Sequence, residues 1–187
     1  KFFKNVLYDN KIGYYSSRLP IGQKGDFITS PNISYLFSEI IAIWMISTWE
    51  LFGKPKYFNI IELGPGDGSL TNVLLRSFKK FPKFNSIKKI FLYEKSNYLK
   101  KLQKRNISDK NVKWINDFKT IKKGPVIFVG NEFFDALPIK QFKKINNLIY
   151  EKNYTFDKNH KIREVYKKAS KNNCKILKSF KILKKLN

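Results

Sequence analysis

Cysteine and histidine are almost absent from this chain of 187 residues, which contains one of each, Cys174 and His160. A single thiol cannot form an internal disulfide bond, and one residue of each type cannot build a cysteine-based zinc site or a His-rich metal centre. The sequence therefore predicts no metal site. The scarcity of cysteine is typical of a reducing compartment.

Long apolar runs are also missing. A membrane-spanning helix needs about 20 consecutive apolar residues, and the longest run here, Ile40–Ile46, lies inside an amphipathic pattern. The front of the chain shows no charged-then-apolar targeting signal, and it starts at Lys1 without a methionine. We therefore expect no membrane span, with the bacterial cytoplasm as the default location and the mitochondrion if the host is eukaryotic. The sequence does not indicate an oligomeric state.

Arginine is scarce although the formal net charge is +24. Such a charge predicts attraction to nucleic acid or to another acidic partner. Lysine, asparagine, isoleucine, phenylalanine and tyrosine are however overused together, as in proteins of AT-rich genomes. A surface that recognises phosphate would use more arginine, whose planar fork pairs with phosphate through two hydrogen bonds. Nucleic acid is therefore kept as a partner that the composition does not favour.

Residues 1–56 are predicted to form an extension of helices and loops before the main domain. Apolar residues at 2–7 indicate a short helix, and a glycine-rich loop follows it. A longer helix is expected next, with Ser30 as its N-cap, Pro31 at its first position and Gly53 at its end.

Residues 57–142 alternate short apolar runs with helical patterns, which is typical of a parallel sheet with right-handed crossovers. We expect an α/β, Rossmann-like core whose sheet stops after its fourth strand. Strands are predicted over 58–63, 90–94, 112–115 and 125–130, and helices over 69–81 and 96–105.

Residues 143–187 are rich in lysine and asparagine and have no clear pattern. The apolar triplets 148–150 and 154–156 could pair as a hairpin. Residues 176–186 form a basic, weakly amphipathic segment.

The segment Glu62-Leu63-Gly64-Pro65-Gly66-Asp67-Gly68 carries the strongest indication of a ligand. Glycine is needed where the backbone adopts angles closed to other residues and where a ligand approaches the main chain. Dinucleotide loops show G-x-G-x-x-G, whereas the glycines here alternate. Glu62 would repel a pyrophosphate but suits the positively charged amino acid end of S-adenosylmethionine (SAM). The loop therefore predicts SAM as the cofactor, bound by Glu62, Gly64, Gly66 and Gly68.

Two further candidates for cofactor binding follow the second and third predicted strands. Glu94 ends the second strand, at the edge where open α/β sheets bind ligands, and its carboxylate can accept both ribose hydroxyls. Asn116 and Asp117 follow the third strand, where the adenine amino group is commonly bound. Glu94 could also be an ordinary strand-end residue, and Asn-Asp is common turn chemistry.

The segment Asn131-Glu132-Phe133-Phe134-Asp135-Ala136-Leu137-Pro138 follows the fourth strand and would face the methyl acceptor. Glu132 and Asp135 are close enough in sequence to converge on one guanidinium or ammonium group. We predict Asn131, Glu132 and Asp135 as catalytic residues that position the acceptor for an in-line displacement. One of Phe133 and Phe134 is expected in the core and the other at the site, without a choice between them.

The sequence resembles the MidA family in four segments that occur in the same order. They are Gly13-Tyr14-Tyr15, Gly25-Asp26-Phe27-Ile28-Thr29-Ser30-Pro31, Glu62-Leu63-Gly64-Pro65-Gly66 and Asn131–Pro138. The resemblance implies a class I SAM-dependent fold and methylation of arginine in a protein, a subunit of respiratory complex I for the mitochondrial members. It also implies that the segment from Gly25 to Pro31 lies near the cofactor, with Thr29 and Ser30 as binding residues. Members of the family are about twice as long, and their later strands complete the sheet.

Two other functions remain open at the level of sequence. An RNA or DNA methyltransferase would explain the charge, but both prolines of the N-P-P-F/Y loop are missing from Asn131–Phe134. A non-catalytic assembly module with the same fold would bind SAM without turnover.

Overall fold

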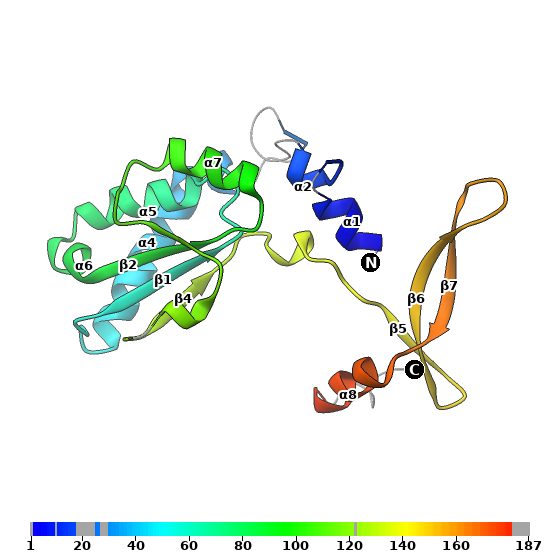
Figure 1. The fold of residues 1–187 in the computed structure, drawn as a ribbon. Coiled ribbons are helices and arrows are strands. Elements are labelled where there is room, and N and C mark those ends of the chain that lie inside the picture. The colour runs from blue at the N-terminus through cyan, green and yellow to red at the C-terminus, as the bar shows by residue number, and fades with distance from the viewer. Residues whose placement is uncertain (1, 10, 18–24, 27–29, 122, 181–187) are drawn as a thin grey trace. The chain divides into compact units, whose positions relative to one another are not determined.

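The computed structural model describes residues 2–9, 11–17, 25–26, 30–121 and 123–180 (Figure 1). The chain divides into two compact units, one of Val6–Leu137 and one of Lys1–Asn5 with Pro138–Asn187. The three regions read from the sequence, 1–56, 57–142 and 143–187, stay a prediction beside this division.

The larger unit is built on a parallel sheet, as the sequence predicts. Its strands lie in the order β3-β2-β1-β4, and every neighbouring pair is parallel. The chain therefore runs outward from β1 to β3 and then returns to the other side of β1. The bounds are β1 Phe58–Leu63, β2 Lys88–Tyr93, β3 Lys113–Ile115 and β4 Val126–Val129.

The helix after the glycine-rich loop begins later than the sequence predicts. Ser30 opens a single turn, α3 (Ser30–Ile33), and the long helix α4 (Tyr35–Leu51) is capped by Ser34, whose hydroxyl accepts from the N–H of Leu36 at 3.2 Å. The prediction of Ser30 as the N-cap is therefore wrong. Ser34 has extended backbone angles, which interrupt the helix and make this serine the cap.

The other helices of this unit lie before and between the strands, and α1 (Phe2–Tyr8) is divided between the two units. They are α2 Tyr14–Ser17, α5 Ser69–Lys79, α6 Pro82–Ile87 and α7 Asn97–Asn106, with single 3-10 turns at η1 Phe118–Thr120 and, after β4, at η2 Phe134–Ala136. The sequence did not predict α6. In the part of the chain that the structure describes, none of the helices is both long and apolar enough to cross a membrane.

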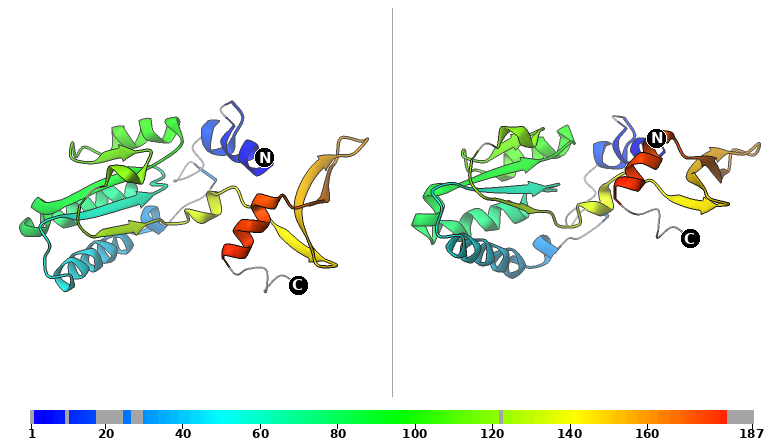
Figure 2. Two further views of the ribbon diagram at one scale, coloured as in Figure 1. Left: turned by 60° about the horizontal axis from the view of Figure 1, so that its bottom comes forward. Right: turned by 90° about the horizontal axis from the view of Figure 1, so that it is seen from below.

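The main core lies on one face of the sheet. Alternate residues of the strands, such as Phe58, Ile60 and Leu92, point to this face and are fully buried. Helices α4 and α5 run side by side (Figures 1 and 2) and contribute Met45, Leu74 and other buried apolar side chains to the same cluster. A smaller cluster, Ile61, Phe91 and Ile115, occupies the opposite face.

The smaller unit contains an antiparallel sheet in the order β5-β6-β7. Its strands are β5 Phe142–Ile145, β6 Leu148–Phe156 and β7 Ile162–Lys168, and α8 (Lys171–Ser179) follows them. The predicted hairpin between 148–150 and 154–156 is wrong, because both triplets belong to the single strand β6. The turns that sequence reasoning missed are Asn146-Asn147, which has positive φ at both residues, and the turn at Asp157, whose carboxylate accepts from the N–H of Lys161.

Candidate active site

The carboxyl ends of β1, β2 and β4 meet at one edge of the parallel sheet. Leu63 pairs with Tyr93, and Glu62 pairs with Val129. The strand order reverses between β1 and β4, and open α/β sheets bind their ligands at such a reversal. Most of the predicted site residues belong to the loops that leave this edge.

The glycine loop between β1 and α5 requires glycine at each of its three positions. Gly64, Gly66 and Gly68 have φ values of 63°, 57° and 89°, in the left-handed region that side chains other than glycine rarely adopt. A Cβ atom on Gly64 would lie 2.9 Å from a ring carbon of Phe133, and one on Gly68 would lie 2.9 Å from Cδ1 of Ile107. The loop is therefore fixed by its backbone and by close packing.

Glu62 lies at the end of β1 and is buried, with 3% of its surface exposed. Its carboxylate accepts a hydrogen bond from the hydroxyl of Thr71 on α5. Burial raises the pKa of Glu62 to about 7, the Thr71 hydrogen bond opposes this rise, and the charges of Asp67 and Glu94 add to it. An acidic group held in this way is stabilised in its ionised form by a cation.

Glu94 is also buried, directly after β2. It accepts from the N–H of Ser96 at 2.8 Å and from Nε2 of Gln103 at 3.3 Å. Burial raises the pKa of Glu94, and these hydrogen bonds and the charge of Lys100 oppose the rise. These surroundings fit a carboxylate that is held in place for a ligand. They fit the alternative, an ordinary strand-end residue that faces solvent, less well.

Gln103 is a site residue that sequence reasoning missed. Its fully buried amide donates to the carbonyl of Gly66 at 2.8 Å and to Glu94, and it accepts from Nε1 of Trp114 at 2.9 Å. The glycine loop, the predicted ribose carboxylate and β3 are thereby joined through one side chain. The sequence pattern that could have indicated Gln103 is its position four residues after Leu99, which places it on the buried face of α7.

The turn after β3 uses its polar residues locally. Asp117 accepts from the N–H of Lys119 at 2.9 Å and caps η1, and Asn116 accepts from Nζ of Lys100 at 2.9 Å. Asp117 is exposed, and its carboxylate retains further acceptor sites. The structure thus shows that Asp117 stabilises a turn, and its contact with adenine stays a prediction.

The loop after β4 holds the three predicted catalytic residues. Asn131 is half-buried, and Glu132 and Asp135 are exposed. Glu132 has φ 53°, a strained backbone angle for a residue with a side chain. Phe133 packs against the glycine loop, while Phe134 is 75% exposed. Of the two phenylalanines, Phe133 is therefore the one that supports the site. The prediction that one of them lies in the core is wrong, because neither belongs to the buried clusters.

Two tyrosines near the N-terminus connect this loop to the Glu94 side. Tyr8 donates from its hydroxyl to the carbonyl of Ala136 in η2 at 2.7 Å, and its ring stacks on Tyr15 with centroids 5.7 Å apart. The carbonyl of Tyr15 accepts from the hydroxyl of Ser96 at 2.9 Å. Burial raises the pKa of Tyr8 to about 12, with smaller contributions from Glu94 and Tyr15.

The segment before α4 is described only in part. Thr29 lies outside the described residues. Ser30 begins α3, and two positions later Asn32 accepts from the hydroxyl of Ser69 at 2.7 Å. The described part of this segment is therefore joined to the first residue of α5, next to Gly68.

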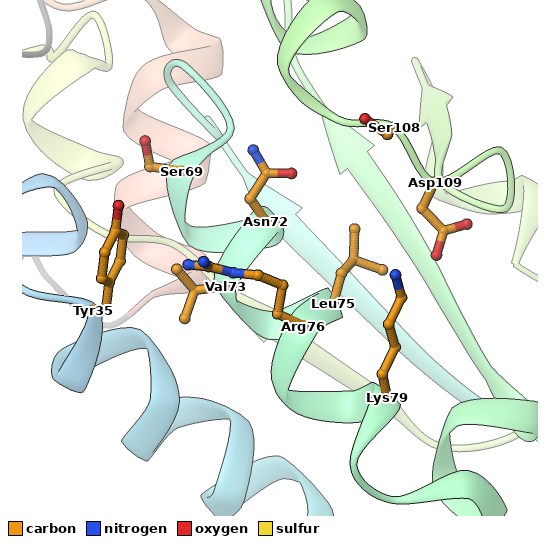
Figure 3. Close-up of a pocket in the computed structure, with 9 residues that line it drawn as sticks. All are labelled: Tyr35, Ser69, Asn72, Val73, Leu75, Arg76, Lys79, Ser108 and Asp109. Carbon is orange, nitrogen blue, oxygen red and sulfur yellow. The ribbon is translucent and has the colours of Figure 1, made fainter.

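A groove of about 440 Å³ lies along the outer side of α5 (Figure 3). The guanidinium of Arg76 lies over the ring of Tyr35, 4.8 Å from its centroid. The groove contains none of the predicted site residues, so it is separate from the candidate active site. Its lining residues are Tyr35, Ser69, Asn72, Val73, Leu75, Arg76, Lys79, Ser108 and Asp109.

Acidic residues concentrate at the carboxyl edge of the sheet, although the chain as a whole is basic. Six of the 14 acidic residues end or follow the four parallel strands. Such an edge attracts cations and repels phosphate groups. These residues are Glu62, Asp67, Glu94, Asp117, Glu132 and Asp135.

The sequence of the chain is similar to those of known methyltransferases. Residues 40–185 match the model of a family described as putative S-adenosyl-L-methionine-dependent methyltransferases. The mitochondrial protein arginine methyltransferase NDUFAF7 of Xenopus laevis is 33% identical in an alignment of 171 positions that covers 79% of this chain and 39% of that protein. The human protein of the same name is 34% identical in an alignment of 168 positions that covers 77% of this chain and 38% of its own length. The chain therefore spans about two-fifths of the length of these curated relatives.

A solved structure from Burkholderia thailandensis shares the fold. It is described as a candidate methyl transferase bound to S-adenosylhomocysteine, and it superposes with a TM-score of 0.74 at 22% sequence identity. The match covers 94% of this chain and 47% of that one. The Rossmann-like methyltransferase fold predicted from the sequence is confirmed, and so is the resemblance to the MidA family.

Proposed function

The chain belongs to the family of putative SAM-dependent methyltransferases, and we propose that it binds SAM and methylates an arginine side chain of a protein. The observation that carries the proposal is the set of carboxylates at the sheet edge of a chain with a net charge of +24. SAM and the acceptor guanidinium are both cations, whereas a nucleic acid substrate is an anion. The names of the relatives, which are protein arginine methyltransferases, support the same acceptor.

The residues present fit SAM. The positive φ angles of Gly64, Gly66 and Gly68 allow a ligand to approach the main chain. Glu62 is a buried carboxyl whose pKa lies near 7, and the cationic amino acid end of SAM would stabilise its ionised form. Glu94, oriented by Ser96 and Gln103, is assigned to the ribose hydroxyls, and Asp117 to the adenine.

Bound SAM supplies an activated methyl group, and the protein has to orient the acceptor for an in-line displacement. Glu132 and Asp135 are assigned to the guanidinium, which they hold by charge-assisted hydrogen bonds. Asn131 is assigned to the same acceptor loop. The carbon–sulfur bond of SAM would break as the methyl group passed to a guanidinium nitrogen, and loss of a proton from that nitrogen would give methylarginine and S-adenosylhomocysteine.

Calorimetric titration with SAM and with S-adenosylhomocysteine tests the cofactor assignment. We expect Gly66→Val and Glu94→Gln to weaken binding of both ligands at least tenfold. Glu50→Gln, on the exposed side of α4, is the matched control and should bind normally. If neither ligand binds the parent protein, or if both site variants bind as the parent does, the cofactor assignment is wrong.

The acceptor class is tested by methyl transfer from radiolabelled SAM to a protein extract. The label should be recovered as methylarginine after acid hydrolysis of the protein. Label in RNA or DNA, with binding that falls steeply with salt, would support the nucleic acid alternative instead. Binding of SAM without turnover would support a non-catalytic module.

The relatives also suggest a location and a substrate. Because their names place them in mitochondria, we propose the mitochondrion as the location, and a subunit of respiratory complex I as the substrate on the MidA resemblance. Mass spectrometry of complex I from host cells with and without the gene should show a methylarginine that depends on it.

A further inference from the structure

Tyr15 belongs to a motif that the proposed function leaves without a role. Gly13-Tyr14-Tyr15 carries part of the family resemblance, yet the residue roles assigned so far include none of the three. The structure places Tyr15 in α2, and the carbonyl of Tyr15 accepts from Ser96, the N-cap of α7 that follows Glu94. The residue therefore has a fixed position beside the cofactor side of the sheet edge.

The side chain of Tyr15 reaches the acceptor side of the same edge. Its ring stacks on Tyr8, and Tyr8 is hydrogen-bonded to the carbonyl of Ala136 in η2. Burial raises the pKa of Tyr15, and the charges of Asp135 and Glu132 raise it further, in that order. Through Tyr8, the half-buried ring of Tyr15 is thus joined to the loop that carries both predicted acceptor carboxylates.

On the basis of the proposed function, we propose that Tyr15 is a specificity-determining residue that binds the acceptor guanidinium together with Glu132 and Asp135. The two carboxylates provide acceptors for the guanidinium N–H groups, and the part of the ring that Tyr8 and Tyr14 leave uncovered provides a surface on which the planar cation stacks. Tyr8 is the positioning residue that holds the ring of Tyr15 against the η2 loop.

This arrangement would distinguish arginine from lysine. A guanidinium is flat, weakly hydrated and able to form two parallel hydrogen bonds, so it stacks well on an aromatic face. An ammonium group is compact and strongly hydrated, and it gains less from the ring. The carboxylates attract both cations, so the larger part of the preference for arginine is assigned to the ring of Tyr15.

The test compares binding of N-acetyl-arginine amide and N-acetyl-lysine amide to the protein saturated with S-adenosylhomocysteine, followed by NMR titration. We expect Tyr15→Leu to weaken binding of the arginine compound by a factor of about five to thirty. Binding of the lysine compound should change less than about twofold, because both carboxylates remain. Tyr15→Phe keeps the ring and should keep the preference for arginine. This variant still tests the proposal if the leucine variant fails to fold.

Tyr57→Leu is the matched control, since Tyr57 precedes β1 at the opposite end of the sheet and is 46% exposed. It should leave the preference unchanged. If Tyr15→Leu keeps the parent's preference for arginine, or if Tyr15→Phe loses it, the proposal is overturned. Unchanged binding of S-adenosylhomocysteine in the Tyr15 variants separates such a failure from a failure of the proposed function. If that ligand does not bind even the parent protein, both are overturned together.

Discussion

Replacing the buried carboxyl of Glu62 by the neutral amide in Glu62→Gln should make the free protein more stable at alkaline pH. The pKa of Glu62 is raised from an ordinary 4.5 to about 7, chiefly by burial. A carboxyl whose pKa is higher in the folded state binds its proton more tightly there. The free energy of unfolding therefore falls as the pH rises from about 4.5 to about 7.

The size of this effect follows from the interval between the two pKa values. At about 1.4 kcal/mol for each pH unit, ionised Glu62 costs the folded state about 3 kcal/mol above pH 7. The glutamine side chain can still accept from Thr71 but carries no charge. Glu62→Gln should therefore match the parent protein near pH 4.5 and exceed its stability by about 3 kcal/mol at pH 8.

Urea unfolding at a series of pH values measures this difference, with Glu50→Gln as an exposed control that should show no such trend. A stability difference between parent and Glu62→Gln that is the same at pH 4.5 and pH 8 would refute the reasoning. Saturating SAM adds a second reading, because a cation beside Glu62 stabilises the ionised carboxylate. SAM should bind the parent more tightly as the pH rises through about 7, and Glu62→Gln should lose this dependence.

Three further substitutions, one with a matched control, test how the site is held together. Gly68→Ala should destabilise the protein by about 2 to 3 kcal/mol, because the added Cβ clashes with Ile107 and the residue has a φ of 89°. Gly53→Ala is the control, since Gly53 has a φ of 77° but open space around it, and it should cost only about 1 kcal/mol. Thermal unfolding of both variants separates the effect of the clash from that of backbone strain. Gln103→Leu removes one hydrogen bond each from the Gly66 carbonyl, the Glu94 carboxylate and the Trp114 indole, and it should weaken binding of S-adenosylhomocysteine at least tenfold by calorimetry. Normal binding would show that Gln103 has no role in holding the cofactor site. Tyr8→Phe should cost about 1 kcal/mol and speed hydrogen exchange around Ala136, and unchanged exchange there would show that the bond does not hold the loop.

Sequence patterns predicted the elements well where their signals are local. The four strands and the glycine loop were found from apolar runs and glycine spacing, and Glu62 and Glu94 follow the strands as expected. Local signals misled where two candidates compete. Ser30 and Ser34 are both good caps, and only the extended backbone at Ser34 decides between them.

The sequence alone determined the α/β class, the glycine loop and the acidic strand ends, because each depends on residues a few positions apart. Only the tertiary structure decided that Tyr8 reaches Ala136, 128 positions away, and that Gln103 joins Gly66 to Glu94. The pKa of Glu62 near 7 is likewise a tertiary property, since burial produces it. These features depend on side chains brought together by folding, and no spacing along the chain encodes such contacts.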